Sequence, residues 1–171
     1  MVSIIFSSNS IRGIFHYNEN KVKEGKAVCL EAVNYPLQAA DMTTEMKLDR
    51  LKKHIQLNPG VKVNAVHISL NFDPSEKLSE GLLKEITTQY MERIGFGDQP
   101  YLLYQHHDAA HPHLHVVTTN IRSDGSRISL HNLGKVQSEA ARKALEAAYN
   151  LVRAEDQNRK LFQVKPVDVG I

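Results

Sequence analysis

Residues 101–120 read YLLYQHHDAAHPHLHVVTTN, and this stretch decides the fold. Two runs rich in aliphatic, β-branched and aromatic residues, 101–106 and 112–120, flank a short turn at residues 107–110. Two strands joined by so short a turn lie side by side and run antiparallel. The sequence therefore predicts a central antiparallel pair of strands.

Further elements follow from the apolar patterns on both sides of this pair. Strands are expected at residues 2–6, 27–33 and 65–72. Helices are expected at residues 11–21, from Thr43 or Thr44 to 57, at 80–94 after a Ser79 cap, and at 135–155. The tail from Leu161 is expected to be irregular or an edge strand. This order predicts an α+β fold, in which helices pack on one face of a mostly antiparallel sheet and leave the other face free for a site.

Length and composition indicate one ordinary globular domain spanning residues 1–171. Hydrophobic residues make up 42% and charged residues 23% of the chain, so disorder is not indicated. No apolar run approaches the roughly 18 residues of a membrane helix, and the single cysteine, Cys29, suits a reducing, cytoplasmic location. The formal net charge of +2 permits nucleic-acid binding without arguing for it.

The histidines are concentrated in the central pair of strands. Five of the nine fall within residues 106–115. Because side chains alternate along a strand, His113 and His115 point to the same face. His106, at the end of the preceding strand, is the best third ligand for a three-nitrogen metal site. Three histidines with open positions admit Zn²⁺, Mn²⁺ or other ions, whereas Mg²⁺ matches an all-nitrogen set poorly unless phosphate oxygens and water complete its shell. The ion expected in function is Mn²⁺ or Mg²⁺, with Zn²⁺ or Ni²⁺ as alternatives.

The turn between the strands carries three further polar residues. Asp108 could hydrogen-bond a ligand imidazole and fix its tautomer. His111 precedes Pro112 and is interpreted as a substrate contact rather than a ligand. His107 is interpreted as a surface residue of the turn.

The string His106-x-Asp108-x-x-His111-Pro112-His113-x-His115, followed by Asn120, resembles the metal motif of MobA/VirD-like relaxases, a family of mobilisation nucleases within the HUH endonucleases. Residues 15–22, FHYNENKV, resemble the relaxase segment with the catalytic tyrosine, and residues 68–72, ISLNF, resemble the family's middle motif. Asp124-Gly125 with Ile128-Ser129 matches the usual continuation. The tyrosine precedes the histidines, as in relaxases, whereas rolling-circle initiators and single-tyrosine transposases of the superfamily have the reverse order.

The resemblance implies an HUH-endonuclease fold of the ferredoxin or RRM-like type and a DNA relaxase activity. Such an enzyme nicks one strand of single-stranded DNA at an origin of transfer, forms a covalent 5′-phosphotyrosine and reseals the strand. It uses a divalent metal ion and works with accessory mobilisation proteins, not with a membrane. Relaxases are commonly longer, so the chain is expected to be the N-terminal nuclease part of a longer protein. The family's variable spacing leaves the third ligand open between His106 and His107.

The resemblance also implies that Tyr17 is the nucleophile, with Tyr35 as the second candidate. A phenol of pKa near 10 needs help to attack at neutral pH. The metal ion, Lys21, Asp108 and His111 are the candidates to give it, and Asp108 is accordingly counted with the catalytic residues. The expected DNA contacts are His111, Arg12, Lys21, Ser69 and Asn120.

Two other functions use the same histidines. A metal-dependent phosphoesterase or nuclease would attack with activated water and would need no tyrosine. A metal-binding or DNA-binding module would bind without cutting.

Overall fold

A five-stranded antiparallel sheet forms the centre of the computed structural model, which describes residues 1–157. The strand order is β1-β3-β5-β4-β2, and every neighbouring pair is antiparallel. The strands are β1 (Val2–Ser8), β2 (Ala27–Val33), β3 (Ala65–Asn71), β4 (Tyr101–His106) and β5 (His113–Thr119). The predicted pairing of the two central strands, β4 and β5, is confirmed.

Three α-helices connect the strands and a fourth follows β5, and the sequence predicts side-chain caps for the first three. The helices are α1 (Ile11–Lys23), α2 (Thr44–Gln56), α3 (Glu80–Arg93) and α4 (Glu139–Tyr149). The hydroxyls of Ser10, Thr43 and Ser79 each accept a hydrogen bond from a backbone N–H in the first turn of α1, α2 and α3. Two 3₁₀ turns, η1 (Ala39–Asp41) and η3 (Ala154–Asp156), and one π-helical turn, η2 (Gly134–Ser138), complete the described elements.

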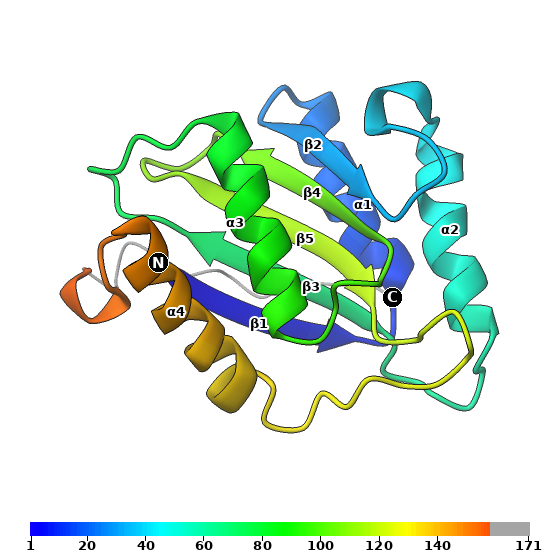
Figure 1. The fold of residues 1–171 in the computed structure, drawn as a ribbon. Helices are drawn as coiled ribbons and strands as arrows, with labels where there is room; N and C mark the ends of the chain where they lie inside the picture. The colour runs from blue at the N-terminus through cyan, green and yellow to red at the C-terminus, as the bar shows by residue number, and fades with distance from the viewer. Residues whose placement is uncertain (158–171) are drawn as a thin grey trace.

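The helices cover both faces of the sheet, and the expectation of helices on one face is wrong in this respect. In Figure 1, α3 lies in front of the strands and α1 lies behind them. On one face, Ile68 and Val116 of the strands pack in one apolar cluster with α3 and α4. On the other face, Leu102 and Val117 pack in a second cluster with Phe15 of α1 and residues of α2. The physical reason is that the central strands are apolar on both sides, and each side must be shielded from water.

The last helix is shorter than the predicted span of residues 135–155. The π-helical turn η2, in which the Ser138 N–H donates to the Leu133 carbonyl, takes up the start of the predicted span and precedes α4. Helix α4 ends at Asn150, which adopts a left-handed conformation with φ 52° and ψ 45°. Asparagine tolerates this conformation better than other non-glycine residues, and it ends helices in the same way as glycine does. The predicted structure of the tail from Leu161 lies outside the described residues.

The second face is the one that carries the histidines. On β5, His113 and His115 share a face with Val117, which packs against α1 and α2. On β4, His106 shares this face with Leu102 and Tyr104. Helix α1 therefore lies over the same face of the sheet as the histidines. Within residues 1–157, no helix has the length and apolar character needed to cross a membrane.

Candidate active site

Three histidines converge at one end of β4 and β5. In the register of these strands, His106 is opposite His113, and His115 is opposite Tyr104. One ring nitrogen of each of His106, His113 and His115 lies within 4.8 Å of the others, and all three residues are buried. His107, in contrast, is exposed. The geometry therefore gathers His106, rather than His107, with His113 and His115 into a group that could hold a metal ion.

Each of these three imidazoles has one nitrogen already engaged by the protein. The His106 Nε2 lies 2.8 Å from the Asn18 Oδ1. The His113 Nδ1 lies 3.3 Å from the His111 carbonyl oxygen, and the His115 Nδ1 lies 2.9 Å from the His67 Nε2. The other nitrogen of each ring is left for an ion. Ligand histidines in metal sites are held in this way through their second nitrogen, so the residues present fit a metal ion.

Burial keeps these imidazoles neutral. It lowers the pKa of His106 to about 3, an effect to which the neighbouring His113 adds. Burial also lowers the pKa of His113, and it holds the pKa of His115 well below its ordinary value. Because only a neutral imidazole offers a lone pair, the cluster is ready to bind a metal ion at neutral pH.

Tyr17 lies against this cluster. Its ring centroid is 6.0 Å from that of His106 and 6.3 Å from that of His115. Residue 17 occupies the α1 position next to the buried Asn18, so the helix that packs on the sheet also positions the phenol. Burial raises the pKa of Tyr17, and the positive charge of Lys21 opposes that rise.

Lys21 and Asp108 join α1 to the turn between β4 and β5. The Lys21 Nζ donates to the Asp108 Oδ2 over 2.5 Å, and it lies 5.9 Å from the centroid of the Tyr17 ring. The Asp108 Oδ1 is 3.6 Å from the His113 Nε2 and 4.0 Å from the His106 Nδ1. These are the nitrogens left for an ion, so Asp108 faces the inner side of the cluster instead of fixing the tautomer from outside.

Two of the other expected contacts lie at the cluster and two lie away from it. Ser69 is buried on β3 directly opposite His115, and its Oγ accepts from the Asn71 Nδ2. The His111 ring centroid is 5.2 Å from that of His113. Arg12 is exposed in the first turn of α1, nine positions before Lys21 and about 13 Å away along the helix axis.

Asn120 lies beyond the far end of β5. Its Nδ2 donates to the Val63 carbonyl, and it lines a separate hollow of about 280 Å³ with Arg127 and His131. The structure thus does not bring Asn120 or Arg12 to the histidines. The second tyrosine candidate, Tyr35, donates its hydroxyl to the Lys47 carbonyl over 2.6 Å.

Two residues of this region, Asn18 and His67, were not anticipated from the sequence. His67 is 1% exposed, and burial lowers its pKa to about 4. The direction of the His67 side chain could have been predicted from strand alternation, because Val66 and Ile68 point to one face and His67 must point to the other. Asn18 follows Ile14 by four positions and therefore lies on the buried stripe of α1.

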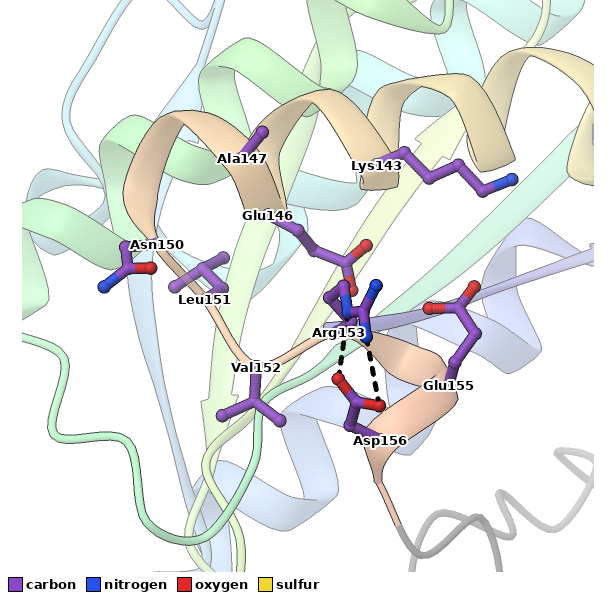
Figure 2. Close-up of a pocket in the computed structure, with 9 residues that line it drawn as sticks. All are labelled: Lys143, Glu146, Ala147, Asn150, Leu151, Val152, Arg153, Glu155 and Asp156. Carbon is purple, nitrogen blue, oxygen red and sulfur yellow. Dashed lines mark hydrogen bonds and ion pairs between the residues drawn. The ribbon is translucent and has the colours of Figure 1, made fainter.

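A larger hollow of about 650 Å³ lies beside the end of α4, away from the histidines (Figure 2). Figure 2 shows Arg153 paired with Asp156 among the residues that line it. Glu146 and Glu155 of its lining are ion-paired with Arg142. Because these charges are balanced among themselves, the histidine cluster is the better candidate for chemistry.

The comparison with known families agrees with this geometry. The family model described as "Relaxase: MobA/VirD2-like, nuclease domain" matches residues 17–151, a span that begins at Tyr17 and contains the three histidines. A search of curated proteins found no significant match. The family match covers well over half of the chain. The chain therefore belongs to the MobA/VirD2-like relaxase nuclease-domain family and is a DNA relaxase.

Proposed function

We propose that this relaxase nicks one strand of DNA at an origin of transfer through Tyr17 and later reseals it. The observation that carries the proposal is the position of the Tyr17 ring, 6.0 Å from the His106 ring and on the same face of the sheet as His113 and His115. A phosphate between the phenol and these imidazoles would meet a nucleophile on one side and the metal ligands on the other.

The reaction exchanges one phosphate ester for another. The Tyr17 oxygen attacks the scissile phosphorus in line, the bond from phosphorus to the 3′ oxygen breaks, and the 3′ oxygen takes a proton from solvent. The product is a 5′-phosphotyrosine with a free 3′ hydroxyl. Because a phosphodiester bond is kept, attack by a 3′ hydroxyl on the phosphotyrosine reseals the strand without an external energy source.

The phenol proton must leave before or during attack. We assign it to Asp108, whose carboxylate is bonded to the Lys21 ammonium 5.9 Å from the centroid of the Tyr17 ring. Burial and the charge of Asp108 raise the pKa of Tyr17, and the charge of Lys21 opposes this rise. Lys21, bonded to this carboxylate, lowers the pKa of Tyr17 and stabilises the phenolate. When the strand is resealed, the proton returns to the departing tyrosine oxygen.

His106, His113 and His115 would hold the divalent ion, which we propose to be Mn²⁺ or Mg²⁺, with Zn²⁺ or Ni²⁺ as alternatives. A bound ion supplies positive charge beside a non-bridging phosphate oxygen, where negative charge develops. The neutral imidazoles would not offset that positive charge, whereas the Asp108 carboxylate, which faces the same space, would offset part of it.

The proposed DNA contacts are assigned by where each residue lies relative to the histidine cluster. Lys21, Ser69 and His111 are proposed to bind the DNA backbone at the scissile phosphate, since each lies at the cluster. Arg12 and Asn120 would contact the strand farther away. Accessory mobilisation proteins remain proposed partners.

Replacing Tyr17 by phenylalanine separates this function from that of a water-using nuclease. With labelled single-stranded origin DNA and Mn²⁺, we expect Tyr17→Phe to lose both nicking and the denaturation-resistant protein–DNA adduct. Tyr149→Phe is the matched control, because the Tyr149 hydroxyl bonds to Glu85 on the α3–α4 side of the molecule. Continued cutting by Tyr17→Phe would support the water-using nuclease. Binding of the DNA by the parent protein without cutting, whatever divalent ion is added, would support a non-catalytic module.

A further inference from the structure

Asn18 connects the helix of the nucleophile to a metal-ligand histidine. Its side chain is fully buried, its Nδ2 donates to the Ile14 carbonyl over 3.0 Å, and its Oδ1 lies 2.8 Å from the His106 Nε2. A carbonyl can only accept, so the amide nitrogen must face Ile14 and the amide oxygen must face His106. The His106 Nε2 must then carry the proton, which leaves its Nδ1 lone pair for an ion.

The same amide reaches a second ligand through His67. The His67 Nε2 lies 3.4 Å from the Asn18 Nδ2 and 2.9 Å from the His115 Nδ1. Because the Asn18 nitrogen is a donor, the His67 Nε2 is an acceptor, and the proton between the two imidazoles belongs to the His115 Nδ1. The His115 Nε2 is thereby left with its lone pair.

The position of His67 on β3 lowers the stability of the fold. The His67 Nδ1 is buried and has no hydrogen-bond partner among the residues that the structure describes. A buried polar atom without a partner is destabilising. A histidine that served only to fill space on β3 would be better replaced by an apolar residue, so the hydrogen bond to His115 is the favourable contact that this position offers.

We propose that Asn18 and His67 are positioning residues that fix the tautomers of His106 and His115 and tie the metal ligands to the helix that carries Tyr17. The orientation of one amide, set by the Ile14 carbonyl, determines which nitrogen is protonated in two of the three ligands. The third ligand, His113, is held by the His111 carbonyl. The proposal rests on the proposed function in taking these histidines as metal ligands.

Nitrogen NMR of the metal-free protein tests the tautomers directly. In ¹⁵N-labelled parent protein at pH 8 with a chelator, we expect His106 to be protonated at Nε2 and His115 at Nδ1. Protonation of His106 at Nδ1, or of His115 at Nε2, would overturn the proposal. This measurement needs neither a variant nor activity.

Metal affinity tests the positioning. Asn18→Leu and Asn18→Asp are both close to asparagine in size, but only aspartate keeps an acceptor for the His106 N–H. We expect Asn18→Leu to weaken Mn²⁺ and Co²⁺ binding by about 10- to 100-fold, and Asn18→Asp, which keeps the acceptor for His106 but loses the N–H groups that face Ile14 and His67, to weaken it less. The same contrast is expected of His67→Phe and His67→Gln, since the glutamine carbonyl can accept from His115.

The melting temperature of each metal-free variant shows that it is folded, and Co²⁺ absorption reports the geometry of the bound ion. Equal metal affinity in Asn18→Leu, Asn18→Asp and the parent would contradict the proposal. Tyr17→Phe separates the two ideas, because it should bind metal as the parent does and lose only nicking. If Tyr17→Phe loses nicking while Asn18→Leu binds metal normally, the positioning role fails and the proposed function stands. If the parent binds no divalent ion, the proposed function fails, and the NMR experiment still decides the tautomers.

Discussion

Acid should destabilise the metal-free protein, and His67 allows the size of the effect to be worked out. Burial lowers the pKa of His67 to about 4, against an ordinary value near 6.5 in the unfolded chain. Above pH 6.5 both states are neutral, and the residue contributes no pH dependence. As the pH falls from 6.5 towards 4, the unfolded chain takes up a proton that the folded protein refuses. Stability is therefore present above pH 6.5 and is lost through this window.

The two pKa values give a loss of about 2 kcal/mol at pH 5 from His67 alone. His67→Gln removes this titration and keeps a carbonyl that can accept from His115. Urea unfolding in the presence of a chelator, at pH 7.5 and pH 5, gives the free energy of unfolding of both proteins. We expect the parent to lose about 2 kcal/mol more than the variant between the two pH values. Equal losses in the two proteins would refute the reasoning that the fold keeps His67 neutral.

Three further predictions concern charge and metal. Lys21→Met removes the charge that lowers the pKa of Tyr17, so nicking at pH 7 should slow by roughly five- to tenfold and its pH profile should move to higher pH; an unchanged profile would exclude this role. The buried Lys47–Glu19 ion pair joins α2 to α1, so Glu19→Gln should cost about 3–5 kcal/mol in urea unfolding, and less when Lys47→Met is added. Mn²⁺ at 100 times its Kd should raise the free energy of unfolding of the parent by about 2.7 kcal/mol, and should leave His113→Ala unchanged in the same assay.

The strands and the histidine geometry were predictable because both follow from local patterns. The period-two alternation of β5 places His113 and His115 on one face without knowledge of the rest of the fold. The short turn then fixes β4 as the neighbour of β5, which brings His106 opposite His113. The bounds of β2 and β4 agree with the predicted residues, since turn residues delimit both strands.

The covering of both sheet faces depends on distant contacts. An amphipathic helix such as α1 has one apolar stripe, but the stripe does not say which face of the sheet it meets. A signal was available in β4, where Leu102 and Leu103 point to opposite faces and both are apolar. That pattern predicts burial on both sides and would have excluded a free face.

The hydrogen bonds around the cluster could not be read from sequence separation. Asn18 and His106 are 88 positions apart, and His67 and His115 are 48 apart. These contacts depend on how closely α1 packs on β4 and on the register of β3 with β5. The left-handed Asn150 that ends α4 is similar, since asparagine permits this conformation without requiring it.

The most direct test of the account is to identify the amino acid that becomes attached to DNA. After reaction of the parent protein with single-stranded origin DNA and Mn²⁺, trypsin should release the peptide of residues 13–21, GIFHYNENK, which contains both His16 and Tyr17. Tandem mass spectrometry of this peptide should place the nucleotide on the Tyr17 oxygen through its 5′ phosphate. Attachment to another residue, or cut DNA with no attached peptide, would contradict the claim that Tyr17 is the nucleophile beside the three-histidine cluster.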